Sequence, residues 1–167
     1  VNEATLINAG LRGGVFTSAN FVNSNLKDAD LYQAKFDYAS LNNAILNGAD
    51  LRAATLYKAN LYNAELDDVE LNNSNLSESD LSSTTLRRSN LTNANLIRTT
   101  LLGADLSMAT LVGANFEWSN MRSVNLRGAD LTDASLTGAV LTGAKADATT
   151  TWPDGFDPVS AGVDIDP

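Results

Sequence analysis

The chain has 167 residues and a formal net charge of −9, with 44% hydrophobic residues and with neither cysteine nor histidine. These absences exclude disulfides, thiolate metal sites and the commonest general bases and nucleophile pairs, so we predict that the protein is not an enzyme. No apolar run approaches the roughly eighteen residues that a membrane span requires, so we predict no membrane insertion.

The acidic residues are unevenly distributed along the chain. Residues 1–145 hold fifteen acids and eleven bases, a net charge of −4, whereas residues 146–167 hold five acids and no base. Phosphate contacts require a basic stripe, and the longer segment is mixed in charge. We therefore predict no direct binding of nucleic acid.

A large apolar residue stands at every fifth position from Leu6 to Leu141, and a small residue stands two positions before each. The twenty-eight large positions hold twenty-three Leu, four Phe and one Met. On an α-helix this spacing would scatter the large residues around the axis, and on a straight strand they would alternate between faces. The period predicts a solenoid that turns a corner once per pentapeptide and keeps the same side inward.

The repeat reads Ala-(Asn or Asp)-Leu-X-X, as in Ala29-Asp30-Leu31 and Ala104-Asp105-Leu106. It resembles the pentapeptide-repeat family of the cyanobacterial type over about residues 4–143. The resemblance implies an all-β fold, a right-handed quadrilateral β-helix in which four pentapeptides form one square coil. It implies about seven coils in residues 1–145, as one domain, followed by a C-terminal capping tail in residues 146–167.

With twenty residues per coil, large residues twenty positions apart should stack inside the rod. Phe16 and Phe36 are such a pair, and we interpret them as core packing and not as a ligand site. The small residues should lie nearer the corners, where a larger side chain does not fit.

An acidic column is predicted on the outside, because residues twenty apart share one face. Asp30, Asp50 and Glu70 should be neighbours, with three further acids in the same part of the rod. The candidate interaction face consists of Asp30, Asp50, Glu65, Asp67, Asp68 and Glu70. Solvent, Arg52 or a bound cation must offset the repulsion. The alternatives are a solvated patch, a docking face for a basic partner, and a Ca²⁺ or Mg²⁺ site. A metal site needs about six oxygens in one shell, which no loop supplies, so we predict no metal or cofactor.

A second column reads Tyr38, Lys58, Glu78, Arg98 and Trp118. It predicts a ladder of weak surface ion pairs that ends in a cation–π contact between Arg98 and Trp118. The alternative interpretation is a recognition stripe.

The two ends of the chain differ. The large-residue register fails at Ala146, and Trp152 and Phe156 are predicted to form a structural cap over the last coil. Asp157 should begin a short helical turn that Gly162 ends. At the N-terminal end, three glycines (Gly10, Gly13 and Gly14) predict a looser first coil, which either frays or is covered by a missing segment or a second molecule. We favour a monomer over an end-to-end dimer.

The expected function is a rigid, non-catalytic protein-interaction or scaffold module whose partner is another protein. The alternative that the family resemblance suggests is a DNA mimic that binds a type II topoisomerase. Val1 in place of Met suits either a chain trimmed after export or an arbitrary start. We favour a periplasm or thylakoid lumen over the cytoplasm.

Overall fold

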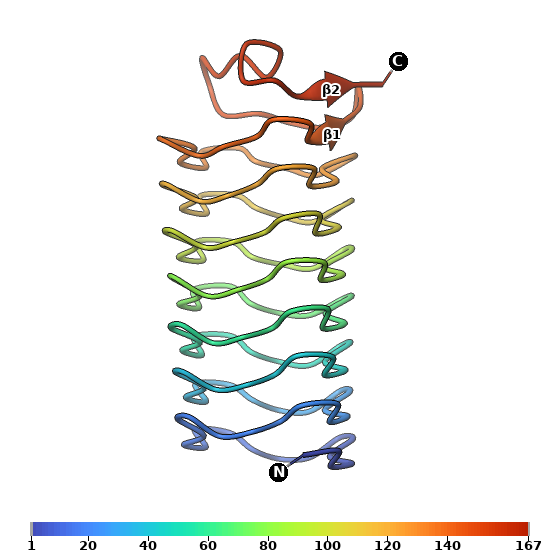
Figure 1. Ribbon diagram of the computed structural model, residues 1–167, viewed down its shortest axis with the longest axis vertical. Coiled ribbons are helices and arrows are strands. Elements are labelled where there is room, and N and C mark those ends of the chain that lie inside the picture. Colours follow the sequence, from blue (N-terminus) through green and yellow to red (C-terminus); the bar gives the residue numbers. More distant parts are fainter. Residues whose placement is uncertain (1, 167) are drawn as a thin grey trace.

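The computed structural model describes residues 2–166 and shows a rod of stacked coils (Figure 1). In each pentapeptide, we call the residue just before the large apolar one the ladder residue. Each ladder residue pairs in parallel with the one twenty positions further on, from Thr5↔Asn25 to Asn125↔Lys145. A coil therefore contains twenty residues, and the predicted all-β solenoid is confirmed. The four sides of the first coil, numbered 1 to 4, contain the ladder residues Thr5, Gly10, Val15 and Asn20.

Two short strands follow at the C-terminal end. Strand β1 is Lys145–Ala146 and β2 is Asp164–Ile165, and the two pair in parallel. No helix occurs within residues 2–166, and hence none that is long and apolar enough to cross a membrane.

Each corner is a tight turn closed by one backbone hydrogen bond. At the first complete corner, the amide of Ala9 donates to the carbonyl of Leu6 at 3.1 Å, and Asn8 has a φ of +56°. A positive φ at the third residue is the mark of a type II turn. The amide of Asn8 also donates to the carbonyl of Lys27 in the next coil at 2.9 Å. This bond offsets part of the cost of the left-handed conformation.

The preference for Asn or Asp at ladder positions has a backbone cause. At many corners the backbone amide of the residue that follows the large one donates to a side-chain oxygen. Oδ1 of Asn20 accepts this bond from Val22 at 3.0 Å, which is an Asx turn. At other corners the acceptor belongs to the preceding coil, as where the backbone amide of Asp67 donates to Oδ1 of Asn47 at 2.8 Å.

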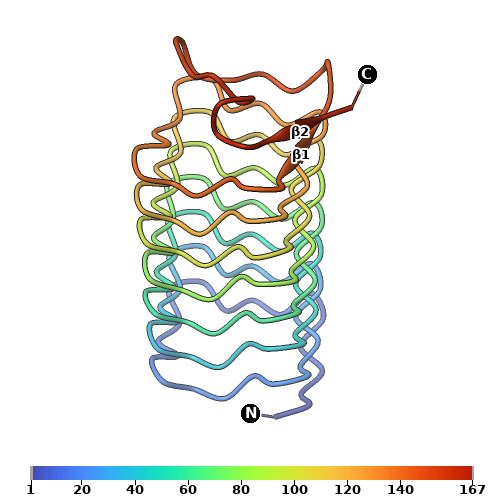
Figure 2. The same cartoon turned by 45° about the horizontal axis from the view of Figure 1, so that its top comes forward.

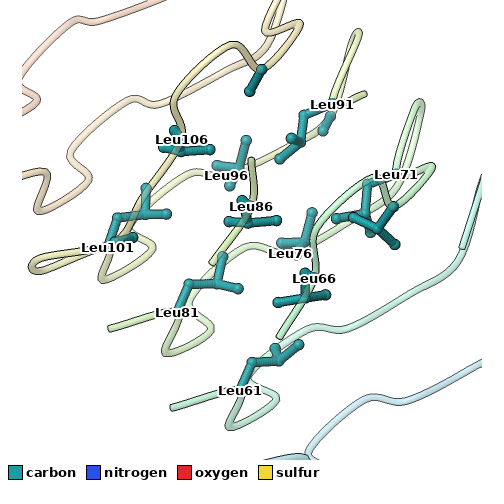
Figure 3. Packing of buried hydrophobic residues seen from close by; sticks show 14 of the residues in the cluster. Leu61, Leu66, Leu71, Leu76, Leu81, Leu86, Leu91, Leu96, Leu101 and Leu106 are labelled. Atoms are coloured by element: carbon teal, nitrogen blue, oxygen red, sulfur yellow. The ribbon is translucent and has the colours of Figure 1, made fainter. Parts of the chain in front are cut away.

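The core contains the large residues, stacked in columns (Figure 3), and the small residues two positions before them. The large residues from Leu26 to Leu131 are completely buried, at 0% exposure. Each contributes roughly 1.5–3 kcal/mol relative to an exposed side chain. The rings of Phe16 and Phe36 stack with centroids 5.0 Å apart, which confirms the predicted pair.

The backbone hydrogen bonds of the first coil are as regular as those of the later coils, although its large residues Leu6, Leu11 and Phe16 are only partly buried. Gly13 and Gly14 make the same hydrogen bonds as the equivalent residues of later coils, to the carbonyls of Tyr32 at 2.8 Å and Leu11 at 3.0 Å. Gly10 pairs with Asp30. Glycine has local reasons here: Gly13 holds a φ of +64°, and a Cβ on Gly14 would lie 2.5 Å from the ring of Phe16.

The register changes by one residue at the C-terminal end. Ala146 occupies the place of a large residue and is completely buried. Thr151 then pairs with Asp130, twenty-one positions earlier instead of twenty. The extra residue ends the regular coils and releases the tail to cross the end of the rod.

The tail lies over the last coil at the C-terminal end of the rod (Figure 2). The rings of Trp152 and Phe156 stack at 5.2 Å against the core. Oδ1 of Asp157 accepts hydrogen bonds from the amides two and three residues later, at 3.1 and 3.2 Å, as an N-cap does. Gly162 ends the turn with a φ of +80°. The amide of Val163 donates to the carbonyl of Pro158 at 3.0 Å, which completes a Schellman motif.

Candidate interaction surface

The predicted acidic column exists on side 2 of the rod. Asp30 pairs with Asp50, and Asp50 pairs with Glu70, so the three carboxylates lie in consecutive coils. The other predicted residues lie beyond this side: Asp67 and Asp68 form part of the corner between sides 1 and 2, and Glu65 is a ladder residue of side 1. The structure thus brings three of the six together and spreads the other three around one corner.

The column is not a bare acidic patch. Arg52 donates to Asp50 through Nε at 2.8 Å and Nη2 at 2.7 Å. These hydrogen bonds lower the pKa of Asp50 below its ordinary value, although partial burial acts in the opposite direction. Arg12 lies 3.5 Å from Asp30. Arg52, one of the alternatives considered from the sequence, therefore offsets part of the repulsion.

An aromatic ring connects these two cations. The guanidinium of Arg12 lies 4.1 Å from the ring centroid of Tyr32, and that of Arg52 lies 5.7 Å from it. The three residues are twenty positions apart, so the column was visible in the sequence, but we did not predict the contact. Tyr32 thus holds both arginines beside the acidic column.

Two further arginines neutralise the corner. Nε of Arg87 donates to Asp67 at 2.9 Å, and Arg88 donates to Asp68 at 2.8 and 2.7 Å. Burial raises the pKa of Asp67, but hydrogen bonds from the side chain and the backbone of Arg87 outweigh it, so the pKa lies below its usual value. The hydrogen bonds from Arg88 lower the pKa of Asp68.

Two carboxylates of the set bind amides instead of cations. Asn47 Nδ2 donates to Glu65 at 3.0 Å, and Asn90 Nδ2 donates to Glu70 at 2.9 Å. Both glutamates are exposed, and neither belongs to an ion pair of the described chain. Within residues 2–166, no group of three or more acidic side chains is arranged to hold a metal ion.

The second predicted column is only partly as expected. Lys58 pairs with Glu78 at 3.3 Å, as predicted. The prediction of a cation–π contact between Arg98 and Trp118 is wrong, because no such contact in the described chain involves either residue. Instead, the ring of Trp118 lies over Gly138 in the next coil, where a Cβ would be 2.5 Å away.

Comparisons with known proteins agree with this architecture. Residues 19–96 match the family described as pentapeptide repeat region, and residues 109–145 match pentapeptide repeats (8 copies). No match was found among curated protein sequences. The fold and the repeats define a quadrilateral β-helix solenoid. The chain belongs to the pentapeptide repeat family.

Several solved structures are similar to the chain. HetL, a pentapeptide repeat protein involved in heterocyst differentiation regulation from the cyanobacterium Nostoc sp. strain PCC 7120, is 30% identical. The match covers 86% of this chain and 73% of HetL, with a TM-score of 0.46. The pentapeptide repeat protein alr5209 from Nostoc is 36% identical. This match covers 64% of this chain and 84% of alr5209, with a TM-score of 0.48. QnrB1, a plasmid-mediated fluoroquinolone resistance protein, is 21% identical. This match covers 99% of this chain and 81% of QnrB1, with a TM-score of 0.52.

Proposed function

We propose that the protein is a rigid, non-catalytic module that binds another protein through one flank of the rod. The charged flank, as we call it, consists of the six acids and their four arginine partners: Asp30, Asp50, Glu65, Asp67, Asp68 and Glu70, with Arg12, Arg52, Arg87 and Arg88. The observation that carries the proposal is the fixed geometry of these charges. Each is attached to a backbone that repeats every twenty residues without an inserted loop.

The side chains of the flank support a protein partner. Paired charges in fixed columns favour a partner with complementary charges, because electrostatic complementarity gives specificity and a faster encounter. Glu65 and Glu70 are exposed and bind only amides, so they are the available anions for a basic group of the partner. Catalysis finds no support, because the sides carry neither an inserted loop nor a histidine.

DNA mimicry has less support from this surface. A mimic of duplex DNA needs a continuous negative potential along the rod. Here Arg52, Arg87 and Arg88 lie within hydrogen-bond distance of three of the acids and interrupt that potential. We therefore place topoisomerase binding second.

A charge-reversal experiment tests the flank. The immobilised protein is used in a pull-down from its native source, at physiological salt. We expect a protein that the wild type recovers and that the variant Glu65→Lys/Glu70→Lys recovers at about one tenth the amount or less. The matched control Glu3→Lys/Asp164→Lys carries the same change in net charge away from the flank, and should recover the partner normally.

Three outcomes would contradict the proposal. Recovery of nothing above background, or equal recovery by both variants, would remove the flank as the docking surface. Inhibition of gyrase supercoiling at low micromolar protein, lost in the flank variant, would replace the scaffold function with the topoisomerase alternative. Circular dichroism of each variant confirms that the coils are intact.

A further inference from the structure

The tail crosses above the last coil at the C-terminal end of the rod (Figure 2). An open pocket lies between this tail and the last coil. Its volume is about 280 Å³, and its apolar lining comes from Ala134, Leu136 and Phe156. Thr137 and Asp154, both exposed, stand at its margin. Leu136 is 8% exposed, whereas the large residues from Leu26 to Leu131 are completely buried. The cap therefore leaves part of the core accessible at this point.

An exposed tryptophan lies one coil before the pocket and is hydrogen-bonded through its backbone to the lining residue Thr137, although it does not line the pocket itself. Trp118 is 63% exposed, and its amide donates to the carbonyl of Thr137 at 3.0 Å. Its ring rests on the backbone of Gly138, which has no Cβ and a φ of +69°. Any other residue at this position would displace the ring. A large ring that is held in place and left in water is typical of an interface anchor, because tryptophan is enriched among the residues that dominate binding energy.

The surroundings of the pocket are acidic. Asp154 lines it, Asp133 and Asp157 adjoin lining residues in the chain, and Glu117 precedes Trp118. None of these four belongs to an ion pair within residues 2–166. One base, Arg98, lies in the column of Trp118. The net charge around the apolar pocket is thus negative.

We propose that this end of the rod is a docking site for a partner segment in which a large apolar side chain is flanked by Lys or Arg. The pocket accommodates the apolar side chain against Leu136 and Phe156, and the exposed ring of Trp118, in the coil before it, extends the surface that the segment contacts. The acids around the pocket pair with the flanking bases, so charge complementarity selects the partner. The site lies apart from the charged flank, and the two proposals can fail separately.

A titration with short peptides tests the proposal. The isotopically labelled full chain is titrated with acetyl-Lys-Lys-Leu-Lys-Lys-amide and followed by amide chemical shifts. We expect saturable shifts at Gly155, Leu136 and the indole N–H of Trp118. The peptide with Ala in place of Leu should bind about tenfold more weakly, since it loses most of the buried apolar surface. The peptide with Glu in place of every Lys should not bind.

Variants separate the pocket from general attraction of basic peptides. Asp154→Lys and Trp118→Ala should each weaken binding of the Leu peptide several-fold. Asp164→Lys makes the same charge change on β2, which packs over the opposite side of the rod end, and should leave binding unchanged.

Three results would overturn the inference. The first is the absence of saturable shifts up to about 5 mM peptide, where even weak pockets fill. The second is equal binding of the Leu and Ala peptides, or shifts centred on the charged flank. The third is a concentration-dependent dimer, detected by light scattering and abolished by Trp118→Ala, which would assign the pocket to a second copy of this chain.

Discussion

At the scale of single residues, the corners concentrate the local strain of the fold. The third turn residue has a positive φ at every regular corner, and most of these residues are not glycine. The left-handed conformation costs an L-residue about 1–2 kcal/mol. The corner therefore tolerates Tyr38 or Trp118 because the surrounding ladder of hydrogen bonds fixes the backbone, and not because these side chains favour the turn.

Replacing a strained corner residue by glycine should stabilise the protein. Ala53 has a φ of +55°, whereas its neighbour Ala54 is buried and has no positive φ. We expect Ala53→Gly to raise the free energy of unfolding by up to about 1 kcal/mol, since relief of strain exceeds the added entropy of the unfolded chain. Ala54→Gly should lower it by about 1–2 kcal/mol. Urea unfolding measures both, and equal destabilisation would contradict the strain argument.

The Asp67–Arg87 pair should make stability depend on pH in the acid range. Because the pKa of Asp67 is lowered in the folded protein, its contribution is fully present above the ordinary carboxyl value. This contribution to stability is lost as the pH falls below about 4 and passes the pKa of Asp67 in the folded protein. Between pH 5 and pH 3, the melting temperature of Asp67→Asn should therefore fall less than that of the wild type. Scanning calorimetry of both proteins at the two pH values measures this difference. Parallel curves for the two proteins would refute this role.

At the scale of elements, the cap and the coils differ in how they are stabilised. A coil is fixed by its neighbours on both sides, whereas the tail has a coil on one side only. The tail replaces the missing neighbour with the stacked pair Trp152–Phe156, the turn from Asp157 to Gly162, and β2. The tail should therefore stabilise the last coil and have little effect on coils further along the rod.

Removing the stacked ring should loosen the end of the rod and leave the middle unchanged. We expect Trp152→Ala to lower the free energy of unfolding by about 1–3 kcal/mol, because it removes aromatic packing over the last coil. Hydrogen exchange should accelerate at residues 131–141 and stay constant at residues 41–71. Val159→Ala is the control, since Val159 is 70% exposed in the same tail. Unchanged exchange at the last coil would mean that the tail does not act as a cap.

At the scale of the whole molecule, the period explains which features were predictable. The stacking of Phe16 on Phe36 and the columns of surface residues follow directly from a repeat of twenty. The turn at Asp157 was predictable because capping signals are local. The contact partner of Trp118 was not predictable. Arg98 and Gly138 lie one coil away on either side of it, and the rotation of its side chain decides between them.

The candidate sites show the same limit. The sequence placed Asp30, Asp50 and Glu70 in one column, but not the pairing of Asp67 and Asp68 with arginines one coil later. The pocket at Leu136 depends on the extra residue near Ala146 and on the path of the tail, which no periodic pattern describes. Periodicity determines positions along the rod, and rotamers and irregular segments determine the contacts.

A solenoid of this kind should tolerate the loss of a whole coil but not of a coil plus one residue. Deleting residues 42–61 joins Leu41 to Tyr62, keeps the spacing of large residues at five, and stacks Leu31 on Leu71. We expect this variant to unfold cooperatively, with a urea m-value about one eighth lower, since it lacks 20 of 167 residues. Deleting residues 42–62 shortens one spacing to four, which turns the following ladder residues out of register with the coil before them. That variant should lose cooperative unfolding as followed by circular dichroism. Equal stability of the two deletions would show that neighbouring coils do not depend on the twenty-residue register.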